Sequence, residues 1–523
     1  MTLRKPIPVI DLFAGPGGLG EGFSSILDPE RSPIFSLKVS AEKDPTAHKT
    51  LSLRSLYRKF PRGKAPDCYY EYIRGEISRE ALFAHPVAAE AGREALEEAR
   101  NFELGKDRPE DLDRHIQAAL GGMDDWVLIG GPPCQAYSIA GRSRRARESL
   151  EKFESDEKHF LYREYLRIIR KHKPAVFVME NVKGMLSSQH GGSPIFGKIV
   201  ADLSSPGDGL EYQIRSLVKP GVAEEMDPHD FVIEAERFGV PQGRHRVILF
   251  GIRTDVARSV PELSTSPEEF VLGNESMKVT VGETLSGLPL LRSKLSKEPD
   301  GHEQWLSALM GVDEELQWYR SEGLNPVFEE MRRAIEKARF HDSTGGPFIR
   351  HDTTNNHMRA RLYDWYVDER MGGVIQHEAR SHMRSDLHRY LFASAFARVK
   401  GLSPRIADFP TPLLPKHENV LSDKVPFADR FRVQLENSWS STVVAHIAKD
   451  GHYFIHPDPS QCRSLTVREA ARLQTFQDNY FFAGNRTEQY TQVGNAVPPL
   501  LARKIAGVVL RFMEAWAQSR SRR

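Results

Sequence analysis

The chain has 523 residues, of which 40% are hydrophobic and 27% are charged, and its formal net charge is +1. These values are ordinary for a soluble globular protein, and the length allows two to four domains. The near-neutral balance excludes a chain that is basic throughout. It leaves room for a basic nucleic-acid cleft, because the clustering of charge matters more than its total.

The cysteine content argues against a structural role for sulfur. Cys68, Cys134 and Cys462 are widely spaced and odd in number, which disfavours a disulfide framework or a CxxC zinc site, and we expect no metal. The N-terminus lacks the apolar core of a signal peptide, and no apolar run has transmembrane length. We therefore expect a cytoplasmic enzyme, and a monomer.

The first predicted elements indicate a cofactor site. Pro8–Phe13 is predicted to be a strand, and residues 15–20 then match GxGxxG before a helix that begins near Glu21. Glycines in such a turn let backbone N–H groups approach a phosphate or another cofactor group. The second predicted strand, Ile34–Ala41, is followed by Glu42, which is suited to bind ribose hydroxyls. A dehydrogenase and any other enzyme with an adenosyl cofactor fit this pattern equally.

The next stretch is interpreted as largely helical. Gly75-Glu76-Ile77 is a candidate turn at the edge of a third strand. Residues 78–122 are rich in Ala, Glu and Arg with weak helical periodicity, and we predict a helical insertion without chemistry of its own.

A buried strand, Trp126–Ile129, then leads into Gly130-Gly131-Pro132-Pro133 and Cys134. The glycines and prolines end the strand and hold the next residue in a rigid turn. A thiol on a loop at this sheet edge is either a nucleophile or a cysteine with no catalytic role, and the residues alone favour neither interpretation. Four arginines within 142–147 follow, either as a solvated loop or as contacts to phosphates.

Polar residues end two further predicted strands. After a helix over Phe160–His172, the strand Ala175–Met179 delivers Glu180 to the sheet edge that carries Cys134. More strands are expected at Tyr212–Val218, Phe231–Glu236 and Arg246–Ile252. Arg244 and Arg246 should point to one face of an extended chain, and two adjacent guanidiniums are costly to bury without an acceptor or anion.

From about residue 285 the pattern becomes irregular, which indicates a second domain with little local signal for its role. Gly451–His456 looks like a strand. Thr466 and Glu469 fit a capping box that begins a helix through Leu473. A helix over Leu500–Trp516 has the apolar stripe of a core element.

Taken together, these segments resemble one family, the DNA (cytosine-5)-methyltransferases of the bacterial restriction-modification type. The resemblance rests on six motifs in the family's order, which are residues 11–18, Pro133-Cys134-Gln135, Glu180-Asn181-Val182, Gln242 to Arg246, Arg463 to Asp478, and Gly494 to Pro498. They cover about residues 8–255 and 425–510. Gln477 departs from the family's usual Pro, and the 78–122 insertion is long.

The resemblance implies an α/β fold with a Rossmann-like S-adenosylmethionine-dependent methyltransferase sheet and a second, smaller target-recognition domain. It implies a catalytic domain over 1–285, a target-recognition domain over 286–489 and a C-terminal segment, 490–523, that returns to the catalytic domain. The implied reaction transfers a methyl group from S-adenosyl-L-methionine to carbon 5 of a flipped-out cytosine in a specific double-stranded DNA sequence. The implied host is bacterial or archaeal, with a cognate restriction or defence system as a possible partner.

The same resemblance assigns residues to roles. Cys134 would bond to cytosine C6, Glu180 would act at N3, and Arg246, with Arg244, would hold O2 and orient Glu180. The expected cofactor residues are Asp11, Phe13, Gly15, Gly17, Gly18, Glu42, Glu76, Pro132, Asn495 and Val497. The expected DNA contacts are Gln135, Ser138, Arg142, Arg144, Arg145 and Arg147. Glu76, expected near the adenine amino group, stands where the family usually has Asp.

Three other readings compete with this one. An RNA (tRNA) cytosine-5 methyltransferase would use the same motifs, although the large variable region favours the reading of DNA. An NAD(P) dehydrogenase accounts for the glycine turn and Glu42 but leaves Cys134, Glu180 and the arginine pair without a role. A catalytically silent DNA-binding protein is disfavoured, because Cys134 and Glu180 are both present.

Overall fold

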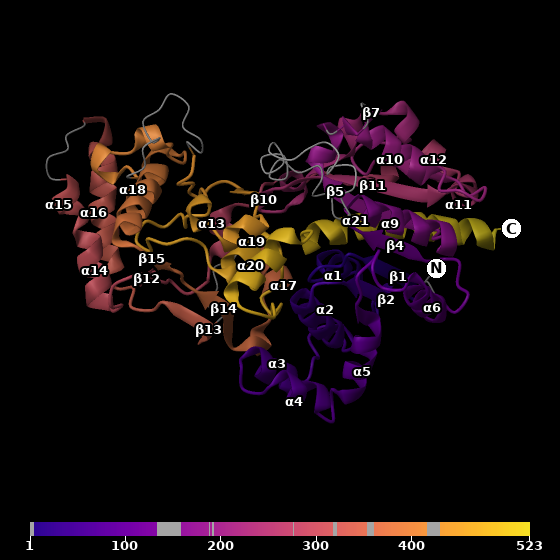
Figure 1. Ribbon diagram of the computed structural model, residues 1–523, viewed down its shortest axis with the longest axis horizontal. Helices are drawn as coiled ribbons and strands as arrows, with labels where there is room; N and C mark the ends of the chain where they lie inside the picture. The colour runs from indigo at the N-terminus through magenta and orange to yellow at the C-terminus, as the bar shows by residue number, and fades with distance from the viewer. Residues whose placement is uncertain are drawn as a thin grey trace.

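The computed structural model describes residues 5–132, 158–187, 189–190, 193–275, 277–316, 322–352, 360–415 and 429–522. Three parts follow one another along the longest axis in Figure 1: a sheet flanked by helices, a central layer, and a distal lobe of helices. The polypeptide crosses between these parts several times, so that residues far apart in sequence meet in the central layer.

The large sheet has the strand order β3-β2-β1-β4-β5-β11-β8, and β9 also pairs with β11. Strands β1 to β5 run parallel, whereas β11 is antiparallel to β5, β8 and β9. The bounds are β1 Ile7–Leu12, β2 Phe35–Glu42, β3 Ala99–Asn101, β4 Val127–Gly130, β5 Val176–Val182, β8 Tyr212–Arg215, β9 Val232–Glu234 and β11 His245–Arg253. The predicted α/β fold with a mostly parallel sheet is confirmed.

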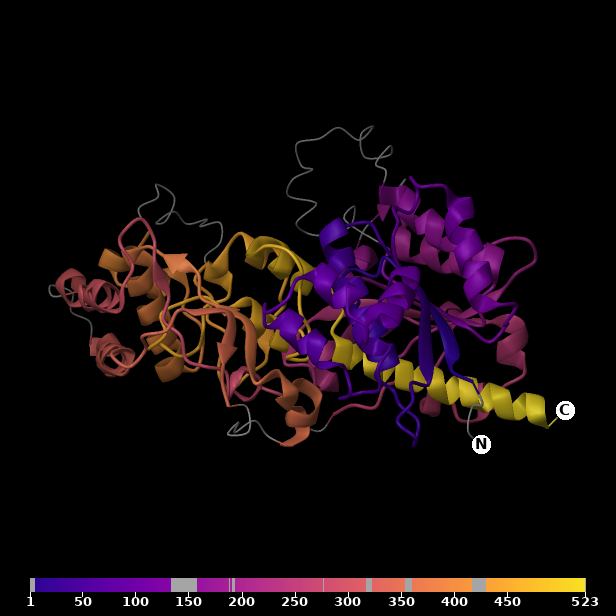
Figure 2. The same ribbon diagram turned by 90° about the horizontal axis from the view of Figure 1, so that it is seen from below.

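Helices cover both faces of this sheet. Val9 faces one hydrophobic cluster and Ile10 faces the other, which is why the central strands are apolar throughout rather than alternating. One face is covered by α1 (Gly18–Ser24) and α21 (Pro499–Ser521), and the other by α6 (Pro109–Leu120), α9 (Lys158–His172) and α10 (Ile195–Ser204). Figure 2 shows α21 running along the sheet to the marked C-terminus.

The C-terminal helix is a core element, as its apolar stripe predicts. Leu501, Ile505 and Phe512 lie in the same cluster as the strands β1 and β11. Within the described part of the chain, the stretch 486–521 alone is long and apolar enough to cross a membrane, and 67% of its most apolar window is buried in the protein. Packing against the sheet accounts for this apolar character.

The region predicted as a helical insertion contains a strand, which corrects the prediction. After α2 (Pro45–Arg58) come α3 (Asp67–Ile73), α4 (Arg79–Ala84) and α5 (Ala89–Glu98), and then β3 joins the sheet edge beside β2 before α6. The turn at Gly75 therefore lies between α3 and α4 and not at a strand end. A strand of three residues, Ala-Arg-Asn, is too short to show a period-2 pattern in the sequence.

The central layer has its own apolar core. It is built by α13 (Val281–Leu285), β14 (Gly373–Glu378), α19 (Val467–Leu473) and α20 (Arg486–Asn495). The capping box predicted at Thr466 and Glu469 is present and begins α19. A short parallel ribbon, β10 (Gln242–Gly243) with β16 (Ser440–Ser441), connects this layer to the large sheet. The strand expected over Gly451–His456 is instead a 3-10 turn, Gly451–Tyr453, followed by bridges at Ile455.

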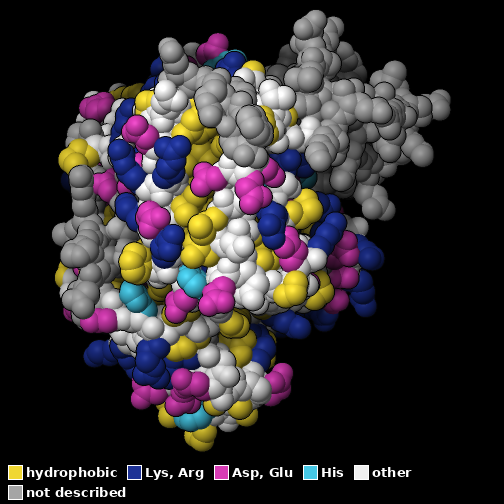
Figure 3. Space-filling view, turned by 90° about the vertical axis from the view of Figure 1, so that its left-hand side faces the viewer, with side chains coloured by type: hydrophobic (Ala, Val, Ile, Leu, Met, Phe, Trp, Pro, Cys, Tyr) yellow, Lys and Arg dark blue, Asp and Glu magenta, His cyan; other side chains and the backbone are white. Residues whose placement is uncertain are grey.

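The distal lobe is mainly helical. Its core is formed by α14 (His302–Met310), α16 (Asn325–Ala338) and α18 (Arg384–Lys400). Its outer face mixes Lys and Arg with Asp, Glu and hydrophobic side chains, as Figure 3 shows. The remaining elements are α11 Thr254–Arg258, α12 Glu262–Thr265, α15 Val312–Leu316, α17 Ala360–Tyr366, β6 Gln189–His190, β7 Ser193–Pro194, β12 Lys294–Leu295, β13 Gly345–Arg350 and β15 Ser381–His382.

Candidate active site

The strand order reverses between β1 and β4, because β2 lies on one side of β1 and β4 on the other. In open α/β sheets, ligands bind beyond the carboxyl ends of the strands at such a switch point. The residues predicted from strand ends should therefore be found together here, and most of those that the structure describes are.

The glycine turn after β1 is strained and is tied to the end of β2. Phe13, a residue with a Cβ, has φ 57°, and Gly15 and Gly17 have φ 57° and 99°. The Gly15 N–H donates to Glu42 Oε2 at 2.8 Å, and the Asp44 N–H donates to Oε1 at 2.8 Å. Burial raises the pKa of Glu42. A left-handed non-glycine residue is held against its preference by its surroundings, and such strain is typical of ligand sites.

Asp11 is an unusual buried carboxyl group of this region. Its side chain is fully buried on β1, and neither carboxylate oxygen has a hydrogen-bond partner in the described part of the chain. Burial raises the pKa of Asp11 to about 8, although Arg58 acts in the opposite direction. An unpartnered buried carboxylate is costly, and it marks a place where a donor or a cation would be favourable.

The far end of the chain reaches the same turn. A Cβ on Gly18 would lie 2.2 Å from the Val497 carbonyl oxygen, so only glycine allows this close approach. The Tyr480 hydroxyl donates to the Pro16 carbonyl inside the turn. Asn495, the last residue of α20, is exposed two residues before Val497. The structure thus brings Val497 to the glycine turn, as the sequence predicts.

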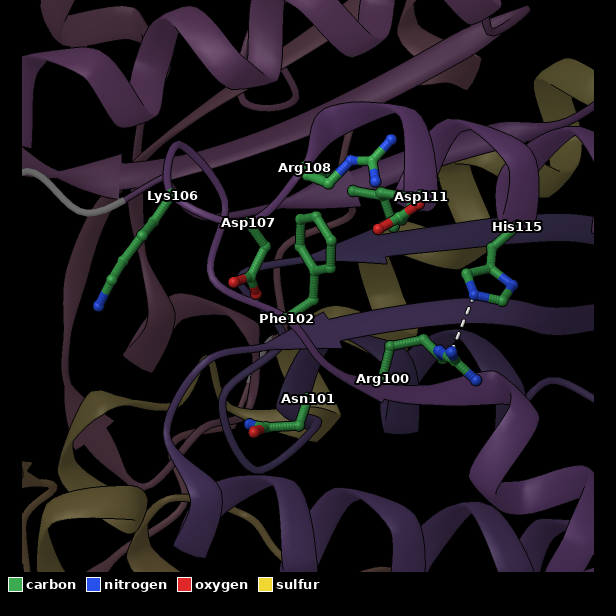
Figure 4. A pocket seen from close by; sticks show the side chains of 9 residues that line it. Arg100, Asn101, Phe102, Lys106, Asp107, Arg108, Asp111 and His115 are labelled. Carbon is green, nitrogen blue, oxygen red and sulfur yellow. Dashed lines mark hydrogen bonds between the residues drawn. The ribbon is translucent and has the colours of Figure 1, made fainter.

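A hollow of about 470 Å³ lies beside the end of β3 (Figure 4). Asn101 pairs with Glu42 across β3 and β2, and its Nδ2 donates to the Glu42 and Lys43 carbonyls at 3.0 Å each. Its side-chain oxygen is left to accept from a ligand. The hollow is lined by Arg100, Asn101, Phe102, Lys106, Asp107, Arg108, Asp111, Leu112 and His115.

Glu76 does not lie at a strand end, and its expected contact with the adenine amino group stays a prediction. It lies between α3 and α4, is exposed, and pairs with Arg74 Nε at 2.7 Å. The hydrogen bond from Arg74 lowers the pKa of Glu76. Asn101, and not Glu76, lies beside Glu42 at the edge of the sheet. The sequence did not reveal Asn101 as a candidate, because so short a strand shows no alternating pattern.

The catalytic carboxylate predicted on β5 is paired with the arginine predicted on β11. Glu180 Oε1 lies 2.8 Å from Arg246 Nε, and both side chains are about 15% exposed. The antiparallel register places Ile248 opposite Glu180 and Arg246 opposite Val182, two residues nearer the C-terminal end of β5. A Cβ on Gly131 would lie 2.9 Å from Glu180 Oε2, which explains the glycine at the end of β4.

Arg244 lies close by but has other partners. Its guanidinium is buried, and Nη1 donates to the carbonyls of Val443 at 3.0 Å and Gly494 at 3.3 Å. Burial, with Arg246 nearby, lowers the pKa of Arg244 well below its ordinary value. Gln242 supports the same junction, because its amide nitrogen donates to the Leu473 carbonyl at 3.0 Å. Arg244 therefore joins the site to the central layer.

The predicted nucleophile lies outside the described residues, as do the DNA-contact residues Gln135, Ser138, Arg142, Arg144, Arg145 and Arg147. Cys134 lies two residues beyond Pro132, which is buried after the end of β4.

The sequence analysis missed three residues near the site. Tyr480 lies just beyond the motif Arg463 to Asp478, Asn101 ends the unrecognised strand β3, and Phe102 follows it.

A mostly parallel sheet of this order, with a strained glycine turn at its switch point, defines a Rossmann-like methyltransferase fold. A solved structure of a putative DNA modification methyltransferase encoded within an E. coli prophage has the same fold. Its TM-score is 0.52 at 18% identity, with 97% of this chain and 99% of that chain covered.

Comparison with protein families identifies the class more narrowly. Residues 99–511 match the family described as C-5 cytosine-specific DNA methylase. The Type II methyltransferase M.Bpa9945I of Bacillus paralicheniformis is 34% identical over 518 residues, which cover 96% of this chain and 98% of that protein. The DNA (cytosine-5-)-methyltransferase M.ApeKI of Aeropyrum pernix is 26% identical, over 76% of this chain and 83% of that protein. The chain belongs to the C-5 cytosine-specific DNA methylase family.

Proposed function

We propose that this enzyme transfers the methyl group of S-adenosyl-L-methionine to carbon 5 of a cytosine that is flipped out of a specific double-stranded DNA sequence. The observation that carries the proposal is the Glu180–Arg246 pair at the ends of β5 and β11, beside the strand end that leads to Cys134. The family to which the chain belongs, and relatives named as type II methyltransferases, support DNA as the substrate.

The chemistry begins with a thiolate. Cytosine C5 is a weak nucleophile, and addition of the Cys134 thiolate to C6 turns the ring into an enamine. A bond forms between sulfur and C6, the C5–C6 double bond opens, and Glu180 donates a proton to N3. C5 would then take the methyl group, and the electron pair of the broken carbon–sulfur bond would stay on the sulfur of the departing cofactor. A base removes the C5 proton, the C5–C6 double bond re-forms, the thiolate leaves and N3 returns its proton to Glu180. Cys134 is four residues beyond Gly130, a span of at most about 14 Å, so the chain is long enough to reach Glu180.

Arg246 is proposed to hold the substrate's O2 and to orient Glu180. The pair is nearly buried, and the contact of Arg246 Nε with Oε1 would restrict the direction of the carboxylate. For Arg244 we propose a supporting role through its bonds to the Val443 and Gly494 carbonyls, in place of the direct contact with cytosine that the sequence suggested.

The residues around the glycine turn fit S-adenosyl-L-methionine. When bound, this cofactor supplies the electrophilic methyl group. Its amino-acid part carries an ammonium, and a positive charge beside the buried Asp11 carboxyl group would favour the ionised form of that group, whose pKa burial raises to about 8. Backbone close to the cofactor would come from Gly15, Gly17, Gly18, Phe13, Pro132, Asn495 and Val497.

The adenosine end is assigned to the ends of β2 and β3. Glu42 can still accept hydrogen bonds from ribose hydroxyls, because a carboxylate offers about four acceptor positions and the Gly15 and Asp44 N–H groups each use one oxygen. We propose that the side-chain oxygen of Asn101 accepts from the adenine amino group, the role first given to Glu76. Phe13 and Phe102 pack against the same core cluster and would provide apolar contact for the base.

The DNA contacts of Gln135, Ser138, Arg142, Arg144, Arg145 and Arg147 stay predictions. Flipping the base costs a few kcal/mol, and arginine contacts to phosphates on both sides of the gap would offset part of that cost. Because the relatives are named type II methyltransferases, we also propose that the enzyme acts in the cytoplasm within a restriction-modification system.

Bisulfite sequencing of DNA from cells that express the protein tests the reaction and identifies the target sequence. Wild-type enzyme should protect cytosines at one sequence from conversion, and Cys134→Ser should protect none. Protection by Cys134→Ser at the wild-type level would rule out the covalent mechanism. Methylation of transfer RNA, with none of duplex DNA in a parallel reaction, would replace the proposed substrate.

A further inference from the structure

The helical insertion α3–α5 lies where the sheet half meets a segment that leaves the distal lobe. In Figure 1, α3 and α4 lie below α17 and β13, on the opposite side from β5 and β10. One apolar cluster joins the two regions, with Tyr69 and Tyr70 of α3 packed with Met371 and Ile375. None of the chemistry proposed above uses this contact.

Arg370 connects the two regions through its side chain. Nη1 donates to the carbonyls of Ala65 and Gly63, and Nη2 donates to Asp67 Oδ1 at 2.7 Å. The guanidinium also lies 4.5 Å from the centre of the Tyr70 ring. Several donors of one planar group are thus used across the contact, which fixes direction as well as distance.

Asp368 extends the connection to the cofactor side of the sheet. Its Oδ2 accepts from the Tyr70 hydroxyl at 2.8 Å and from Asn479 Nδ2 at 2.7 Å. The Asn479 side-chain oxygen accepts from Arg54 at 2.9 Å, and Arg54 pairs with Glu21 of α1. Buried hydrogen-bonded networks of this kind specify one arrangement of the elements they join.

The sheet half also meets the central layer beside the β10–β16 ribbon, where Arg244 donates to the Val443 and Gly494 carbonyls, and between α2 and α20, where the Thr50 hydroxyl donates to Gln492 at 2.6 Å. The Arg370 and Asp368 contacts lie away from β10 in Figure 1 and join the insertion to the segment that leads into β14. Contacts at separated places define the orientation of one body on another, and those of Arg370 and Asp368 fix it on the side of the insertion.

We propose that Tyr70, Asp368 and Arg370 are positioning residues, a brace that holds the distal lobe in the orientation in which it meets DNA. This inference rests on the proposed function in one respect, namely that the distal lobe contacts DNA. Without the brace, the lobe samples other orientations. If the lobe adopts the orientation that binds DNA for about a tenth of the time, the apparent Kd for DNA rises about ten-fold.

The test compares two tyrosine hydroxyls: that of Tyr70 donates across the contact to Asp368, whereas that of Tyr363 donates within its own segment to Glu369. Tyr70→Phe removes the bond across the contact but keeps the ring under Arg370, and Arg370→Met removes the guanidinium. Tyr363→Phe is the matched control, because the Tyr363 hydroxyl donates to Glu369 at 2.8 Å within the same segment. We expect the KM for DNA to rise about ten-fold in the double variant Tyr70→Phe/Arg370→Met, with kcat and the KM for S-adenosyl-L-methionine within about two-fold of wild type. Tyr363→Phe should match wild type.

An unchanged KM for DNA in the double variant, with or without a lower Tm, would overturn the brace. So would an equal rise in Tyr363→Phe. Amide hydrogen exchange of β14 provides a readout that needs no catalysis, and it should become faster in Tyr70→Phe alone. A wild-type protein that methylates no DNA would refute the proposed function, whereas unchanged exchange in β14 would refute the brace.

Discussion

The sheet half and the distal lobe use buried arginine–carboxylate pairs for different purposes. In the sheet half, Glu180 and Arg246 meet at the ends of two strands, 2.8 Å apart, where the sheet opens to a ligand. In the distal lobe, Glu330 and Arg398 connect α16 to α18 at 3.1 Å, on helices whose other faces form the core. The exposed fractions of the two carboxylates are similar, at 14% and 12%. We therefore expect position in the fold, and not burial or pairing, to distinguish the proposed catalytic pair from the supporting one.

The largest expected effect tests this difference directly. Glu180→Ala should lower the rate of methyl transfer about 10²- to 10⁴-fold, because it removes the proton donor to N3. Glu330→Ala removes an equally buried carboxylate from the lobe and should leave the rate within about three-fold of wild type. Single-turnover transfer from radiolabelled S-adenosyl-L-methionine measures both.

Glu180→Gln sharpens the same comparison. An amide can donate a hydrogen bond to N3 but cannot give up a proton, so its rate should lie between those of wild type and Glu180→Ala. Equal losses in Glu180→Ala and Glu330→Ala would show that the first variant acts through stability and would contradict the assigned role.

The same contrast explains what the sequence could predict. The strands β1, β2, β4, β5 and β11 are apolar runs ended by Gly, Pro or charge, and the sequence located all of them. Glu180 and Glu42, whose roles stay predictions, lie at or near those strand ends. The sequence did not predict β3, because a strand of three residues is too short to show an alternating pattern. The contact with adenine was therefore assigned to Glu76 and not to Asn101. The role of Arg370 depends on carbonyls about 300 residues away, which no local pattern encodes.

The second expected effect is acid lability where the distal lobe joins the central layer. Burial lowers the pKa values of His377, His382 and His456 to about 4, 3 and 4. These imidazoles are neutral in the folded protein, whereas an unfolded chain binds protons below about pH 6.5. The stabilisation linked to these neutral histidines is therefore fully present above about pH 6.5. As the pH decreases toward 4, the free energy of unfolding falls by about 3 kcal/mol for each histidine.

Hydrogen exchange as a function of pH measures this effect by region. The segments around β14, β15 and α18 should lose protection between pH 6.5 and 4 before β1 and β5 do. His382→Gln should weaken the pH dependence, whatever its effect on stability at neutral pH. The control His229→Gln changes an exposed histidine and should leave the dependence as it is. Simultaneous loss of protection in the sheet and the lobe would contradict the assignment to these histidines.

The smallest expected effect concerns the cofactor end of the sheet half. Asn101→Ala should weaken binding of S-adenosyl-L-methionine about five- to ten-fold, because one neutral hydrogen bond to adenine is worth about 1 kcal/mol and the Glu42 and Lys43 carbonyls lose their donor. Glu76→Ala should not change the affinity, since Glu76 lies on the surface beside Arg74. Calorimetric titration of both variants measures the difference. If Glu76→Ala weakens binding and Asn101→Ala does not, adenine lies beside the insertion and not at the end of β3. The insertion would then belong to the cofactor site, and its contact with the distal lobe would relate cofactor binding directly to the orientation of the lobe.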